Sequence, residues 1–134
     1  MDRLSPERRS ALMAKVRSKN TGPEIRLRSL AHRLGYRFRL HARDLPGSPD
    51  LVFAGRGKVV FVHGCFWHGH PGCRGGRVPA TRRYYWRTKL ENNARRDRRA
   101  IAALRRLGWG VMVVWECQLR NEARLAGRLR RFLG

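Results

Sequence analysis

Acidic residues are scarce in this sequence, and lysine is scarcer still. Nine aspartates and glutamates stand against 31 lysines and arginines, 27 of them arginine, which gives a formal net charge of +22 over 134 residues. A compact chain of this charge attracts polyanions, so the composition favours a nucleic acid as its partner. Charge alone leaves two other interpretations open, a ribosomal protein or a proteome rich in arginine.

Long apolar runs are also missing. Runs such as Gly110–Trp115 are too short to cross a bilayer, which excludes a membrane-spanning protein. The N-terminus lacks the apolar segment of a secretory signal, so we expect an intracellular, cytoplasmic protein. Hydrophobic residues still make up 42% of the chain, which excludes a disordered basic tail. The length predicts one domain over residues 1–134.

Cysteine is rare and odd in number. The sequence has only Cys65, Cys73 and Cys117 and shows no signal peptide, which argues against a disulfide framework. Residues 63–73 also contain three histidines, and sulfur and imidazole ligands suit tetrahedral zinc. We therefore predict a structural zinc site of three cysteines and one histidine. The alternative is the burial of cysteines that bind no metal.

The hydrophobic pattern predicts helices and strands after a basic N-terminal helical arm over residues 1–20. The expected helices cover residues 5–16, 21–34, 84–107 and 119–133, and the expected strands cover residues 36–41, 50–54, 58–63 and 111–115. A long helix connects the last two strands, which predicts that they are parallel, whereas the earlier strands form an antiparallel meander. We expect an α/β fold with a mixed β-sheet flanked by helices.

Asp50 is the first candidate for chemistry. It follows Pro49 at the start of an apolar strand, and the next strand ends at His63. This order is similar to the first half of the nuclease signature Pro-Asp…(Asp/Glu)-x-Lys, in which groups on two strands share a metal ion, with His63 in place of the lysine. If His70 is the zinc ligand, His63 and His68 stay free to act as a general base. Alternatively, Asp50 caps the preceding turn.

Three other polar side chains have two interpretations each. Asn93 and Asp97 lie on the apolar face of the long helix, so they point toward the sheet and need hydrogen-bond partners. They either tie the helix to a loop or support the site. Glu24 has capping-box spacing from Thr21, which favours a helix cap, but an acid directed at the site is the alternative.

Aromatic residues lie in and after the histidine- and cysteine-rich loop. Phe66 and Trp67 are inside it, and Trp86 follows among arginines. Aromatic side chains beside basic ones can stack on bases or wedge between base pairs. They can equally cover the zinc site and the sheet, and the residues alone leave both interpretations open.

Six ordered blocks of the sequence resemble one family. They are Leu-Pro-Gly-Ser-Pro-Asp (45–50), Val-Val-Phe-Val-His-Gly-Cys-Phe-Trp-His (59–68), Val-Pro-Ala-Thr-Arg (78–82), Arg-Asp-Arg-Arg (96–99), Leu-Gly-Trp (107–109) and Val-Trp-Glu-Cys (114–117). They are similar to the very-short-patch repair (Vsr) DNA mismatch endonucleases of bacteria, and the resemblance extends over nearly the whole chain. It implies a restriction-endonuclease-like fold, a structural Zn²⁺ ion and Mg²⁺-dependent nicking of DNA 5′ to the T of a T:G mismatch. Such mismatches arise by deamination of 5-methylcytosine. It further implies a monomer on DNA and bacterial mismatch-repair proteins as partners.

The resemblance also implies roles for individual residues. Asp50 resembles the catalytic aspartate that binds Mg²⁺, and Val62, where the family has threonine, would bind through its backbone carbonyl. His68 resembles the histidine that activates water, with His63 and Glu24 in support. The implied zinc ligands are Cys65, His70, Cys73 and Cys117. The implied DNA contacts are the wedging residues Phe66, Trp67, Trp86 and Met13, and the mismatch-contacting residues Lys89 and Asn93.

Two rival functions follow from the same residues. One is a restriction-endonuclease-like nuclease with a different lesion or sequence specificity. The other is a non-catalytic, zinc-containing nucleic-acid binder. The presence of Asp50, His63 and His68 together argues against the second.

Overall fold

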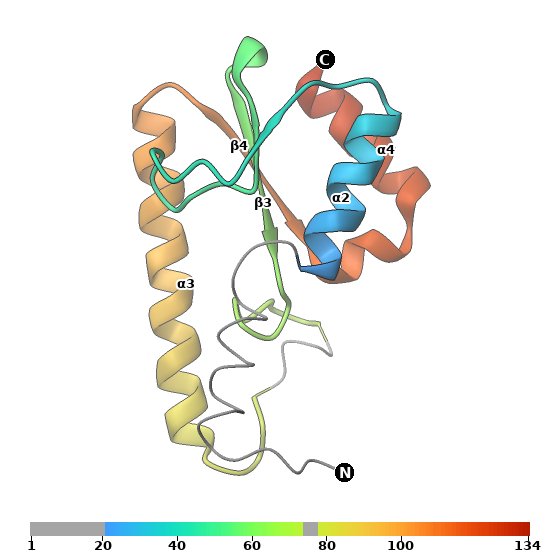
Figure 1. The fold of residues 1–134 in the computed structure, drawn as a ribbon. Coiled ribbons are helices and arrows are strands. Elements are labelled where there is room, and N and C mark those ends of the chain that lie inside the picture. The colour runs from blue at the N-terminus through green and yellow to red at the C-terminus, as the bar shows by residue number, and fades with distance from the viewer. Residues whose placement is uncertain (1–20, 74–77) are drawn as a thin grey trace.

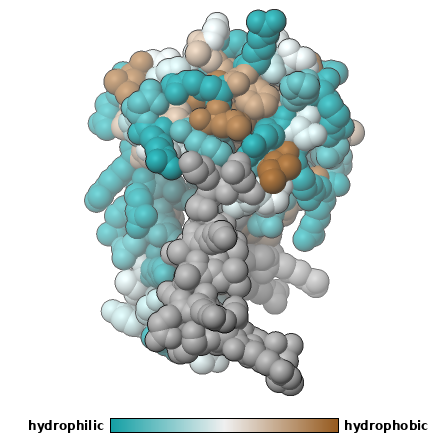
Figure 2. Space-filling view, viewed as in Figure 1, coloured by the Kyte–Doolittle hydropathy of each residue, from teal (hydrophilic) through white to brown (hydrophobic). Residues whose placement is uncertain are grey.

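The computed structural model describes residues 21–73 and 78–134 of the chain. The basic arm predicted over residues 1–20, with Met13, lies outside the described residues. No helix within the described ranges is long and apolar enough to cross a membrane. On the face drawn in Figure 2, hydrophilic residues cover most of the described surface, in keeping with the excess of arginine.

Four strands form one mixed sheet in the part of the chain that the structure describes. In sheet order they are β1 (Arg39–Leu40), β2 (Leu51–Phe53), β3 (Lys58–His63) and β4 (Gly110–Trp115). The pairs β1–β2 and β2–β3 are antiparallel, whereas β3 and β4 are parallel, with His63 opposite Trp115. The predicted meander and parallel pair are therefore confirmed, and β4 is an edge strand of this sheet.

Helices cover both faces of the sheet (Figure 1). The helices α2 (Gly22–Arg33) and α4 (Glu122–Leu133) pack on one face, and the long helix α3 (Arg83–Arg106) packs on the other. Because α3 joins β3 to β4 across the second face, the chain forms the crossover that a parallel pair requires.

Two predicted boundaries are wrong. The last helix begins at Glu122 and not at Leu119, because Leu119 belongs to the 3₁₀ helix η3 (Glu116–Arg120) and the side chain of Asn121 caps α4. The strand predicted over residues 36–41 shortens to the two residues of β1. Its aromatic side chains pack edge-on against a phenylalanine of β2, so packing and not a hydrogen-bonded ladder holds this segment.

Alternate residues of β3 enter two different apolar cores. Val60 packs with Leu129 between the sheet and the helices α2 and α4, whereas Phe61 packs with Leu104 under α3. His63 is on the same side of the strand as Phe61, because side chains alternate with a period of two. The carboxyl end of β3 is thus the point at which the core gives way to polar side chains.

Candidate active site and metal centre

Two cavities adjoin at the carboxyl end of β3. The larger has a volume of about 650 Å³ and the smaller about 450 Å³. Residues that line both are Glu24, Val62, His68, Arg96 and Asp97. They come from α2, β3, the loop after β3 and α3, so elements from both sides of the sheet contribute to one open depression.

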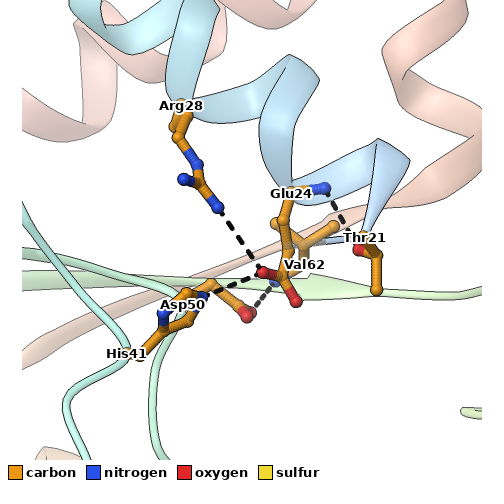
Figure 3. A network of polar contacts seen from close by, with 6 residues as sticks. All are labelled: Thr21, Glu24, Arg28, His41, Asp50 and Val62. Carbon is orange, nitrogen blue, oxygen red and sulfur yellow. Dashed lines mark hydrogen bonds and ion pairs between the residues drawn. The ribbon is translucent and has the colours of Figure 1, made fainter. Parts of the chain in front are cut away.

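Asp50 lies immediately before β2 and lines the smaller cavity. Its Oδ2 accepts a hydrogen bond of 2.6 Å from the backbone N–H of Val62 (Figure 3). Its side chain also interacts with the adjacent carboxyl of Glu24. Burial raises the pKa of Asp50 to about 7, and the adjacent Glu24 carboxylate adds to this effect. Two adjacent carboxyl groups offer the kind of oxygen ligands that Mg²⁺ prefers.

The carboxylate of Glu24 is buried and contacts two basic side chains. Its Oε2 lies 3.1 Å from Nε2 of His41 and 3.9 Å from the Arg28 guanidinium (Figure 3). The backbone N–H of Glu24 donates to Thr21 Oγ1 at 3.4 Å, so Thr21 caps α2 as predicted. Glu24 therefore takes part in the cap through its main chain, while its carboxylate faces Asp50 and His41.

His41 is a residue that sequence reasoning missed. It follows β1 in a left-handed backbone conformation, with φ of 50°, which histidine adopts more readily than most residues. Its backbone N–H donates to the Asp50 carbonyl at 3.3 Å. Neither a motif nor a periodic pattern points to a single histidine in a turn, so only the folded structure connects it with Glu24.

His63 and His68 form a stacked pair with ring centroids 3.9 Å apart. Nδ1 of His68 lies 2.6 Å from Oδ2 of Asp97 on α3. If Nδ1 carries the proton and donates it to this carboxylate, Nε2 is the basic nitrogen of the ring. Burial, with the neighbouring His68, lowers the pKa of His63 to about 4, so His63 is neutral at physiological pH. Asp97 thus ties α3 to the loop after β3, and the loop residue that it contacts is one of the predicted site residues, so both of its predicted roles stay open.

Cys65, His70, Cys73 and Cys117 form a second cluster. Their ligand atoms all lie within 4.8 Å of one another, and Cys117 Sγ is 3.5 Å from His70 Nδ1. Burial and the neighbouring thiols raise the pKa of Cys65 to about 12, so this thiol stays neutral until a cation offsets the charge of its thiolate. Three sulfurs and one imidazole at these separations are a donor set that suits zinc.

Trp115 connects the two clusters. Its ring stacks on His70 at a centroid distance of 4.1 Å and meets the ring of His63 edge-on at 5.2 Å. The ring of His68 is 6.4 Å away. Through Trp115, the conformation of the cysteine-rich loop therefore affects the position of the histidine pair. The sequence does not reveal this connection.

Phe66, Trp67 and Trp86 form an aromatic group at the edge of the larger cavity. Their ring centroids are 5.0–6.1 Å apart, and none of the three belongs to either apolar core. The ammonium of Lys89 lies 5.8 Å from the ring centre of Trp67, and the Asn93 side chain donates to the Trp67 carbonyl at 2.9 Å. Asn93 thus ties α3 to the loop, one of the two roles predicted for it.

The structure brings most of the predicted site residues together. Those around the smaller cavity are Glu24, Asp50, Val62, His63 and His68, whereas Trp67, Lys89 and Asn93 line the larger one. Phe66 and Trp86 contact Trp67, and the four predicted zinc ligands are in one cluster. Met13 lies outside the described residues.

Comparison with known proteins gives similarity over nearly the whole chain. A family model described as DNA mismatch endonuclease Vsr matches residues 1–74. The type II nicking enzyme V.XorIIP of Xanthomonas oryzae pv. oryzae is 60% identical over 132 residues, which are 98% of this chain and 96% of that protein. The DNA mismatch endonuclease Vsr of Escherichia coli K12 is 45% identical over 87% of this chain and 74% of its own length. The type II nicking enzyme V.NaeI of Lentzea aerocolonigenes is 43% identical, over 86% of this chain and 71% of its own.

Proposed function

Because this chain belongs to the DNA mismatch endonuclease Vsr family, we propose that it nicks duplex DNA 5′ to the T of a T:G mismatch by Mg²⁺-dependent hydrolysis. The observation that carries the proposal is the convergence of two carboxylates and a histidine pair on one cavity, beside a half-buried aromatic group. The proposed fold class is restriction-endonuclease-like, which accords with the mixed sheet and its flanking helices.

A divalent cation fits the carboxylate pair. The side chains of Asp50 and Glu24 interact, and a cation can replace the proton that Asp50 holds. The N–H of Val62 points to Asp50, and the carbonyl of the same residue projects to the same side of a strand, which adds an oxygen ligand. We assign Mg²⁺ to Asp50 and the Val62 carbonyl. When bound, it supplies positive charge that offsets the charge of the scissile phosphate.

His68 is the proposed general base. Its Nδ1 is committed to Asp97, so Nε2 accepts the proton of a water molecule as the water oxygen attacks phosphorus. The P–O ester bond to the leaving sugar oxygen breaks as the new bond forms, and this oxygen takes a proton from solvent. The Asp97 carboxylate then stabilises the protonated ring. His63 stacks on this ring and, being neutral, holds it in position without repelling the charge that it gains.

The aromatic group is the proposed mismatch reader. A T:G wobble pair stacks poorly, so a wedge of Phe66, Trp67 and Trp86 separates it from its neighbours at less cost than a matched pair. Lys89 and Asn93 lie beside Trp67 and offer donors to the exposed base edges. Met13 stays a prediction from the resemblance, as an additional wedging residue.

The proposed zinc ion is held by Cys65, His70, Cys73 and Cys117, the four residues that the sequence predicts. It would fix the loop that carries His68 and the aromatic group, and through Trp115 it would support the histidine pair. Further partners, by the same resemblance, are bacterial mismatch-repair proteins.

A panel of substrates tests the specificity. Nicking rates are compared on one duplex sequence that carries T:G, another mismatch or a matched pair at the same position. We expect strong preference for T:G. Equal rates on another lesion would make the chain a nuclease of different specificity, and binding without a nick at any lesion would make it a non-catalytic binder.

The contact between His41 and Glu24 leads to a test of positioning. Replacement of His41 by alanine removes a hydrogen bond to a carboxylate, a contact worth about 1–2 kcal/mol, so we expect a roughly 5- to 30-fold lower single-turnover rate. His41→Gln is the matched control, because its amide nitrogen offers an N–H at similar reach. DNA affinity is expected to stay unchanged in both variants. Equal rates for alanine and glutamine would contradict the assigned contact.

The raised pKa of Asp50 predicts a pH-dependent response to Mg²⁺. The folded, metal-free protein keeps the Asp50 carboxyl protonated up to about pH 7, whereas the unfolded chain ionises it at lower pH. The stability that the protonated carboxyl contributes to the folded state is therefore lost as the pH rises through that value. Mg²⁺ needs the ionised form, so the Mg²⁺-induced rise in Tm should be larger at about pH 8 than at about pH 5.5. Asp50→Asn should abolish the difference. A rise in Tm that is the same at both pH values would count against this site.

A further inference from the structure

A row of arginines near the carboxyl terminus lines two adjoining cavities away from the site described above. Arg124, Arg128 and Arg131 recur on one side of α4 at helical spacing, and Arg120 precedes them in η3. One cavity has a volume of about 430 Å³, and its lining includes Arg124 and Arg128 of α4 together with Arg120 and Cys117 of η3. The other has a volume of about 460 Å³ and adjoins the first at Arg128. We call the two together the α4 groove.

The second cavity follows the edge of the sheet. It is lined by Arg128 and Arg131, by Phe132, and by residues 111–113 of the edge strand β4. The α4 groove thus runs from the end of η3 along β4, with cationic side chains over its length. None of its lining residues lines the two cavities around His68.

The positive charge of this groove is not neutralised within the described part of the chain. There, none of the four arginines forms an ion pair or hydrogen bond through its side chain with another residue. Glu122, the acid of α4, pairs instead with Arg33 of α2 at 3.2 Å. Arg128 is half-buried between the two cavities. A half-buried arginine without an acidic partner favours an anion from outside the chain.

The groove begins where the cysteine-rich cluster ends. Cys117 lines it and contacts His70, which stacks on Trp115, and Trp115 contacts the histidine pair. A continuous series of side-chain contacts therefore links the cavities around His68 to the groove. Arginine forks suit phosphate, and from Arg124 to Arg131 the helix extends about 10 Å, along which each DNA strand presents about three phosphates.

We propose that the α4 groove binds the phosphate backbone of the duplex that is being cleaved, at a segment that flanks the lesion. The chain then grips its substrate at two places, and the groove adds affinity without reading the bases. This proposal rests on the chain being a DNA endonuclease but not on its preference for T:G.

The test compares duplexes of two lengths. The triple variant Arg124→Gln, Arg128→Gln, Arg131→Gln removes three charges of the groove. A matched variant, Arg98→Gln, Arg105→Gln, Arg106→Gln, removes three exposed charges of α3 that line neither site. Kd is measured by fluorescence anisotropy over a range of salt, on a duplex of about one helical turn and on one of about four turns, both with the same T:G mismatch.

We expect the groove variant to bind the long duplex about tenfold or more weakly than the unaltered chain, with a salt slope shallower by about 2–3. Its affinity for the short duplex, and its Tm, should match those of the α3 variant. Unchanged affinity for the long duplex would overturn the proposal, and so would an equal loss on both lengths or in both variants. Polyglutamate is tested as a second polyanion. If the groove variant bound polyglutamate more weakly than the α3 variant did, but bound both duplexes equally well, the occupant would be an acidic polypeptide and the proposal would be overturned.

The two proposals fail separately. A length-dependent loss of binding without any nick at T:G would leave the α4 groove in place and refute the proposed reaction. A specific nick whose affinity does not depend on the three arginines would do the reverse.

Discussion

Replacement of His68 by alanine is expected to lower the nicking rate at a T:G mismatch by about 10²- to 10⁴-fold, the usual contribution of a positioned general base. Affinity for the mismatched duplex should change little, because the ring contacts Asp97 and His63, whereas the proposed wedge is formed by other side chains. The rate is measured under single-turnover conditions, and Kd is measured with Ca²⁺ in place of Mg²⁺ so that the duplex stays intact.

Asp97→Asn is the companion of this variant. It keeps the size of the side chain but removes the charge that fixes the tautomer and stabilises the protonated ring, so we expect a smaller loss, about 10- to 100-fold. The two changes should not be additive, since Asp97 acts through His68. Equal losses of rate and of affinity in His68→Ala would remove His68 from the chemistry.

Loss of the zinc ligands should have the largest effect on stability. Structural zinc contributes about 10–16 kcal/mol to folding in small domains, comparable with the whole stability of a chain of this size. We therefore expect Cys117→Ala, or prolonged chelation, to abolish cooperative unfolding or to lower Tm by well over 10 °C. Elemental analysis of the purified chain should give about one zinc per molecule.

His32→Ala provides a matched control for this prediction, because His32 is exposed on α2 and outside the cluster. It should leave Tm and zinc content unchanged. A chain that contains no zinc and melts at the same temperature with and without a chelator would show that the four residues form a plain buried cluster, the alternative that the sequence leaves open.

The elements that position the site could be predicted because their patterns are local. The apolar strands around Phe61 and Val113, the long helix between them and the loop of cysteines each carry a strong signal, and their order predicts the parallel pair that brings Cys117 to Cys65. Asp97 could also be singled out, since a carboxylate on the apolar face of a helix needs a partner.

Contacts across the fold could not be predicted in the same way. The spacing of Glu24 from Thr21 describes only the helix start, so it does not reveal that the carboxylate reaches Asp50. His41 and Trp115 have no distinctive pattern in the sequence, and their roles arise from distances between elements that only tertiary packing determines.

The central claim is tested most directly by mapping the nick. A duplex with one T:G mismatch, labelled on the T strand, is incubated with the chain and Mg²⁺, beside the matched C:G duplex and the Asp50→Asn variant. We predict one nick, immediately 5′ to the mismatched T, absent from the matched duplex and from the variant. A nick at the same position in the C:G duplex, or full activity of Asp50→Asn, would contradict the account.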